Sequence, residues 1–173
     1  MRIWTAILIW LAAAVAAPAQ ETPPQVLIID SDRLYAETLY GRRLEAELAA
    51  EISAVQDEND RIAETLREEE LNLTDRRPDM DPEAFREEAR AFDEKVQEVR
   101  TSRDAKAVEL QAKRAAARAR FEEQVQGIVA NVMLERGAVM VMEQRNVVLS
   151  VRTVNITDDV IVRVDAQLGD GSQ

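Results

Sequence analysis

The sequence predicts an α+β fold in which a long antiparallel helical coiled-coil hairpin projects from a small β body. Over much of residues 31–136, apolar residues recur at alternating steps of four and three, the spacing of a coiled-coil seam. Short apolar runs that are typical of strands stand before and after this region. We therefore expect a body made of residues 20–30 and 137–169, and an arm made of residues 31–136.

Residues 1–19 have the pattern of a secretory signal peptide. Arg2 is followed by an apolar run over residues 3–15, which is shorter than a typical membrane span. Small residues at 17–19 predict cleavage after Ala19, with residues 14–16 as a competing site. A retained N-terminal anchor is the alternative interpretation.

The first part of the body is a short apolar run that follows an extended lead-in. Pro23 and Pro24 lie in this lead-in, and residues 26–29 are too few for a helix but suit a buried strand. Asp30, Ser31 or Asp32 is then expected to cap the first long helix. Gly41 interrupts the helical pattern, and we interpret it as a tolerated glycine or a close contact, with a hinge as the alternative.

The arm is recognised by its seam, which is clearer in the second helix than in the first. The first helix has Leu44, Leu48, Ile52, Val55, Asn59, Ile62 and Leu66. The second has Phe85, Ala89, Phe92, Val96, Val99, Arg103, Lys106, Leu110, Lys113, Ala117, Phe121, Val125, Ile128 and Val132. The polar members Asn59, Arg103, Lys106 and Lys113 allow two interpretations: a solvated coiled coil whose polar residues set the register, or a flexible arm whose helices splay.

A short tip at residues 75–81 is expected to reverse the chain and make the two helices antiparallel. Pro78 is expected to move Arg77 out of the helical region. Asp81 suits the N-cap of the second helix, and Pro82 suits its first position.

The remainder of the body begins after Gly137, a typical C-cap residue. Residues 138–142 and 147–151 are expected to form an antiparallel β-hairpin with a turn at residues 143–146. Thr157 is expected to cap a short helix that ends at Gly169.

A body of about fifty residues buries little core by itself, and its free strand edges favour pairing between chains. We therefore expect an oligomer that is held together by apolar residues of the body. These are Val26, Leu27, Ile28, Ile29, Val139, Val141, Val147, Leu149, Ile156 and Ile161.

The composition excludes several classes of function. The chain has no His and no Cys, which excludes zinc sites of the usual kind and catalysis by Ser-His or Cys-His pairs. Aromatic residues make up 4%, which argues against a conventional ligand pocket. The net charge of −11 argues against nucleic-acid binding. We therefore expect no enzyme activity, no catalytic residue, no cofactor and no metal.

The order of these pieces resembles the Skp/OmpH family of periplasmic chaperones. The resemblance spans the signal peptide, the strand that runs into Arg33 and Leu34, the charged hairpin and the C-terminal part of the body. Its most specific piece is Asn155-Ile156-Thr157-Asp158-Asp159-Val160-Ile161. The family typically has Asp-Ile-Thr-Asp-Glu-Val-Ile there, so this chain differs at Asn155 and Asp159.

The resemblance implies a periplasmic homotrimer whose three hairpins enclose a cavity for unfolded outer-membrane proteins. It implies a holdase that prevents aggregation without ATP or a metal. The best-known members are basic, whereas this chain has a pI near 4.6. Binding to lipopolysaccharide or anionic membranes is therefore not carried over.

Small and flexible side chains between charged ones are the candidate client-facing residues. Ala89, Val96, Ala105 and Val108 offer many weak contacts that add up over several arms. The alternative is that they only pack one arm helix against the other. The rival function is a structural coiled-coil spacer or tether in the cell envelope, which would not suppress the aggregation of an unfolded barrel protein.

Overall fold

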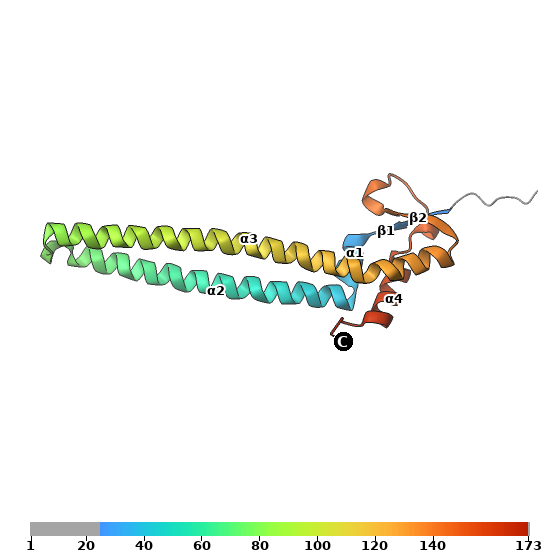
Figure 1. The fold of residues 1–173 in the computed structure, drawn as a ribbon, viewed down its shortest axis with the longest axis horizontal. Coiled ribbons are helices and arrows are strands. Elements are labelled where there is room, and N and C mark those ends of the chain that lie inside the picture. The colour runs from blue at the N-terminus through green and yellow to red at the C-terminus, as the bar shows by residue number, and fades with distance from the viewer. Residues whose placement is uncertain (1–24, 173) are drawn as a thin grey trace, which may run out of the picture.

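The structure, a computed structural model, describes residues 25–172. A long helical hairpin extends from one side of a small body, which confirms the predicted fold class (Figure 1). The predicted signal peptide and residues 20–24 lie outside the described residues. The elements in chain order are β1 (Gln25–Ile29), α1 (Ser31–Glu37), α2 (Leu39–Arg76), η1 (Arg77–Asp79), α3 (Pro82–Glu135), β2 (Ala138–Glu143), η2 (Gln144–Asn146), η3 (Arg152–Val154) and α4 (Thr157–Leu168).

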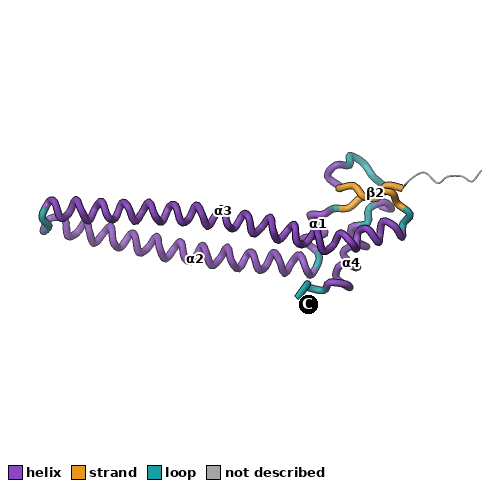
Figure 2. Tube along the Cα trace, in the orientation of Figure 1, coloured by secondary structure: helices purple, strands orange, loops and turns teal. Residues whose placement is uncertain are grey.

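The arm consists of α2 and α3, which run antiparallel side by side (Figure 2). With 38 and 54 residues, the two helices are about 57 and 81 Å long at 1.5 Å per residue. At the tip, the Asp81 carboxylate accepts hydrogen bonds from the backbone N–H groups of Glu83 and Ala84, at 2.9 and 3.3 Å. The predicted cap is therefore confirmed.

The backbone of Arg77 differs from the prediction. Its φ of −50° and ψ of −43° are helical, and Pro78 lies inside the 3₁₀ turn η1. The extended residue is Met80, whose ψ is 148°. The restriction before proline is a steric preference, and here the short 3₁₀ turn that reverses the chain overrides it.

The predicted first long helix is divided at Thr38. This residue is extended, with a ψ of 151°, and separates α1 from α2. The Thr38 hydroxyl accepts from the N–H of Gly41 at 3.2 Å, and an Asp165 carboxylate oxygen accepts from the N–H of Leu39 at 2.8 Å. A Cβ at position 41 would lie 1.8 Å from the carbonyl oxygen of Tyr35. The close-contact interpretation of Gly41 is therefore confirmed.

The sheet has two parallel strands among the described residues, β1 and β2. The predicted antiparallel hairpin is wrong, because residues 147–151 form no strand. Between the two segments that were predicted to pair, Gln144–Asn146 forms a 3₁₀ turn without the glycine that tight hairpins prefer. One edge of β1 pairs with β2, and its Ile28 carbonyl accepts from the N–H of Ile156 at 2.9 Å. Residues 147–151 pair with neither strand.

The short helix α4 packs against α1, α2 and α3 and begins at Thr157. The predicted capping role of Thr157 is wrong, because Ile156 is the N-cap residue and Thr157 is the first residue of α4. The Asn155 side-chain oxygen accepts from the N–H of Thr157 at 3.0 Å. The Thr157 hydroxyl instead accepts from the N–H of Asp30 at 2.9 Å. This bond joins the end of β1 to α4.

The core lies in the body and includes the base of the arm. Phe121 of α3 contacts Tyr35 edge-to-face at 5.0 Å and stacks on Tyr40 at 5.7 Å between ring centroids. The buried apolar cluster is Leu27, Ile29, Leu34, Tyr40, Leu44, Phe121, Val125, Ile128, Val132, Ala138, Ile156, Val160 and Val164. The arm helices thus supply apolar surface that the short strands lack. Across residues 25–172, no helix combines the length and the hydropathy needed to cross a membrane.

Candidate functional site

The seam between α2 and α3 runs along the arm and is the first candidate site. The predicted seam positions of α3 are half-buried or buried, except Lys113, and the residues between them are mostly exposed. From residue 45 to residue 120 no side chain is fully buried. We call residues 45–120 the free arm. Its two helices therefore contact each other along a thin apolar line that solvent reaches from both sides.

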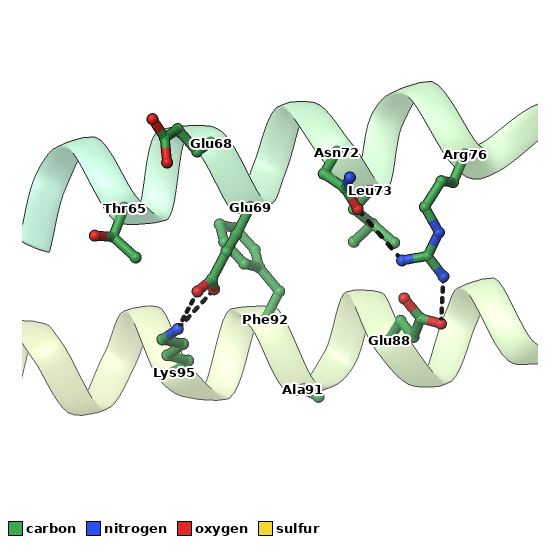
Figure 3. A pocket seen from close by; sticks show the side chains of 10 residues that line it. All are labelled: Thr65, Glu68, Glu69, Asn72, Leu73, Arg76, Glu88, Ala91, Phe92 and Lys95. Carbon is green, nitrogen blue, oxygen red and sulfur yellow. Dashed lines mark hydrogen bonds and ion pairs between the residues drawn. The ribbon is translucent and has the colours of Figure 1, made fainter.

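Ion pairs join the two helices across this seam at four levels. They connect Glu51 with Lys113, Glu58 with Lys106 at 2.6 Å, Glu69 with Lys95 at 2.5 Å and Arg76 with Glu88 at 2.8 Å. Figure 3 shows the two pairs nearest the tip, with the Phe92 ring pointing from α3 toward α2. The pair at the tip has the opposite polarity, which suits a cation at the end of α2 and an anion near the start of α3.

These contacts change the acidity of their members. A hydrogen bond from Lys106 lowers the pKa of the Glu58 carboxyl, and one from Lys113 lowers that of Glu109. Hydrogen bonds to Glu51 and Glu109 raise the pKa of Lys113. The lowered pKa values of the carboxyl groups and the raised pKa of Lys113 both favour the charged forms, so these ion pairs persist at neutral pH.

The polar seam residues have defined partners. An Arg103 Nη2 atom donates to the backbone carbonyl of Asn59 at 2.7 Å, while its Nε is buried without a partner. Lys106 and Lys113 reach glutamates of α2. These contacts support the interpretation in which polar residues set the register, because each one joins a particular level of α2 to a particular level of α3.

An open groove of about 550 Å³ lies between the helices near the tip. Leu73 of α2 and Phe92 of α3 give it an apolar floor, and Glu69 and Lys95 stand at its rim (Figure 3). The groove is shallow and flanked by charges. Such a surface suits weak contact with a mobile chain better than a tight fit to a small molecule.

The four candidate client-facing residues do not lie on one face. Ala89 and Val96 are half-buried in the seam, whereas Ala105 and Val108 are exposed. The side chain of Val108 is 70% exposed. Their contact with a client stays a prediction.

The residues predicted to hold an oligomer together divide into three groups. Leu27, Ile28, Ile29 and Ile156 are buried inside the chain's own core, and Val26, Val141, Val147 and Ile161 are half-buried. Val139 is 61% exposed and Leu149 is 89% exposed.

Five further apolar side chains in the same part of the chain are exposed and were not predicted as interface residues. These are Leu134, Met140, Val148, Val151 and Val162. Met140, Val148 and Val151 belong to short apolar runs of the sequence, whereas Leu134 and Val162 are exposed residues of the helices α3 and α4.

The fold and the site define a class of protein with a small apolar body and one long, charged helical arm. The model of the family described as outer membrane protein (OmpH-like) matches residues 25–164. The chain belongs to this family, as the sequence analysis predicts.

A solved structure has the same fold. It is the crystal structure of a candidate outer membrane chaperone (OmpH-like) from Caulobacter crescentus, with a TM-score of 0.79 and 21% identity. The match covers 86% of this chain and 88% of the other. A search of curated proteins found no match.

Proposed function

We propose that the protein is a periplasmic holdase chaperone that binds unfolded outer-membrane proteins and prevents their aggregation without ATP. The observation that carries this proposal is the free arm, in which no side chain between residues 45 and 120 is fully buried. Membership of the OmpH-like family supports the same function.

The arm offers what a holdase needs. An unfolded barrel protein exposes short apolar segments that differ in sequence, so its partner must accept many of them weakly. Half-exposed apolar side chains along the seam, such as Ile62, Leu66, Val96 and Val99, provide many such contacts. The charged residues between them keep both the arm and a bound segment in water.

The proposed assembly is a homotrimer that is joined through the body. Val139 and Leu149 are large, exposed and apolar, and they lie on the body, away from the arm. Burying them against other copies removes apolar surface from water, which is the main driving force of stable association. Three arms that project from one body would multiply weak contacts into useful avidity.

The structural spacer is the alternative function. It also needs long helices, but it needs no accessible apolar seam. A spacer would favour a seam buried by large apolar residues at each level, whereas this seam includes Asn59, Arg103 and Lys106.

An aggregation assay tests the proposal. A denatured outer-membrane barrel is diluted into buffer with or without the purified protein, in the absence of nucleotide, and turbidity is followed. The proposal expects turbidity to fall as the chaperone concentration rises. Equal turbidity with and without the protein would leave the spacer as the better account.

A further inference from the structure

The four ion pairs between α2 and α3 form a regular ladder. In every pair the two residue numbers add to 164, so the helices keep one antiparallel register from base to tip. The members of the ladder are Glu51–Lys113, Glu58–Lys106, Glu69–Lys95 and Arg76–Glu88.

The ladder runs along one edge of the hairpin. Along each helix its members are separated by seven, eleven and seven residues. Steps of seven and eleven residues fall within about 20° of whole turns of an α-helix. All four members therefore share one line on each helix, on the same side of the seam.

The opposite edge has a different character. Helical periodicity places three residues of α2 and three of α3 on it, all of them exposed: Gln56, Ala63, Glu70, Asp93, Arg100 and Ala107. Within residues 25–172, no ion pair joins α2 to α3 along this edge. Glu70 and Asp93, whose numbers add to 163, stand at one level with the same charge sign.

The difference in attraction between α2 and α3 at the two edges decides at which edge the helices separate. The seam gives little clamping force, because no side chain between residues 45 and 120 is fully buried. The ladder adds attraction along one edge, and like charges and alanines weaken the other. We propose that each arm is latched along the ladder edge and opens along the opposite edge. Ile62, Leu66 and Val99 already line an open groove on the ladder edge, beside Glu58 and Lys95. Opening lets an apolar client segment reach these side chains and Val96 from the opposite edge as well.

The opening itself can be measured without any client. The chain has no Cys, so spin labels go only where cysteines are introduced. Ala63→Cys with Arg100→Cys places a label pair on the free edge. Thr65→Cys with Ser102→Cys places a matched pair on the ladder edge at about the same height, beside a groove that Thr65 and Lys95 line.

Distances between the labels are read by pulsed electron paramagnetic resonance. In low salt the free-edge pair should give the broader distribution. In about 1 M salt, where the Debye length is about 3 Å, the ladder-edge distribution should broaden to match it. Equal widths at the two edges in low salt would overturn the proposal.

A charge swap provides the control for the ladder. Glu58→Lys alone or Lys106→Glu alone should broaden the ladder-edge distribution at low salt, because each places like charges together. The double swap restores an ion pair at the same level and should restore the narrow distribution. A double variant as broad as the singles would contradict a role for ion pairing.

The client half of the inference rests on the proposed function. A short bifunctional thiol crosslinker across Ala63→Cys and Arg100→Cys should weaken suppression of barrel aggregation at least twofold, whereas the crosslink across Thr65→Cys and Ser102→Cys should not. Equal suppression by both crosslinked forms would refute client entry at the free edge. Loss of suppression by the unmodified protein would instead refute the proposed function and leave the distance measurements standing.

Discussion

Single residues at the junction of body and arm are placed by close contacts rather than by local sequence preference. Gly41 lies against the carbonyl of Tyr35, and Thr38 is fully buried between α1 and α2. The Asp165 carboxylate that accepts from the N–H of Leu39 comes from α4, 126 residues away. The direction in which the arm leaves the body therefore depends on a few individual contacts, those of Gly41, Thr38 and Asp165.

Gly41→Ala tests this dependence. The added Cβ would lie 1.8 Å from a backbone oxygen, so α1 and α2 must shift apart. We expect the free energy of unfolding to fall by roughly 1–3 kcal/mol, as for overpacked cores. Chemical denaturation followed by circular dichroism measures the change.

Gly127→Ala is the matched control in α3. Nothing lies within 4 Å of a Cβ there. Alanine favours a helix over glycine, so we expect this variant to be more stable than the native chain by up to about 1 kcal/mol. A Gly41→Ala variant as stable as Gly127→Ala would show that the junction tolerates the methyl group.

Among the elements, the arm could be predicted from the sequence because its signals are local. Seam spacing, the Asp81 cap and Gly137, whose φ is +63°, each depend on neighbours within a few residues. The break at Thr38 could not be predicted, because its partner Asp165 is distant in the sequence. The strand expected at residues 147–151 failed for a different reason: Gln144–Asn146 forms a 3₁₀ turn, which does not lead the chain back antiparallel to β2.

The candidate site was predictable to a similar degree. Lys106 and Lys113 stand out in the sequence as polar seam residues, but their glutamate partners on α2 do not. Those partners are identified by the register of the hairpin: a residue of α2 lies opposite the residue of α3 whose number brings the sum to 164. This pairing becomes visible only once the register of the hairpin is known.

The shifted pKa values of two ladder residues, Glu58 and Lys113, predict how the stability of the arm depends on pH. The pKa of the Glu58 carboxyl is lowered in the folded arm, from an unfolded value of about 4.3. Its contribution to stability is therefore present above about pH 4.3 and is lost as the pH falls through the lower folded value. The raised pKa of Lys113 contributes stability below about pH 10.4, which is lost as the pH rises through the higher folded value.

Acid also relieves the repulsion of a chain with a charge of −11, so the native protein must be compared with a control. Lys106→Gln with Lys113→Gln removes the two lysines and keeps the carboxylates. The native chain should melt at a higher temperature than this variant at pH 7, and the gap should close as the pH falls below about 4. A gap that stays constant down to pH 2 would contradict the assignment.

At the scale of the whole molecule, exposure separates residues that build the body from those available to join copies. Ile28 is buried inside the chain's own core, so Ile28→Asp would damage folding before assembly. Val139 and Leu149 are exposed and can be changed with little effect on the single chain. They are the better probes of the proposed homotrimer.

Val139→Asp with Leu149→Asp should therefore lower the oligomeric mass. Two buried charges at the proposed interface cost far more than two solvated ones. Static light scattering at micromolar concentration should give a smaller mass than for the native chain, with unchanged helical content. Val108→Asp, at a comparably exposed apolar site on the arm, should leave the mass unchanged, and an unchanged mass for the double variant would place the interface elsewhere.

The central claim is that the arm does the holding, and a shortened arm tests it most directly. Removing residues 62–68 from α2 together with residues 96–102 from α3 deletes one heptad from each helix and keeps all four ladder pairs. The core around Phe121 and the exposed body residues stay in place. The number of chains in the oligomer should therefore not change. The account predicts that this variant assembles normally and suppresses the aggregation of an unfolded barrel less well than the full-length chain, because the accessible seam is shorter. Normal assembly with undiminished suppression would contradict it.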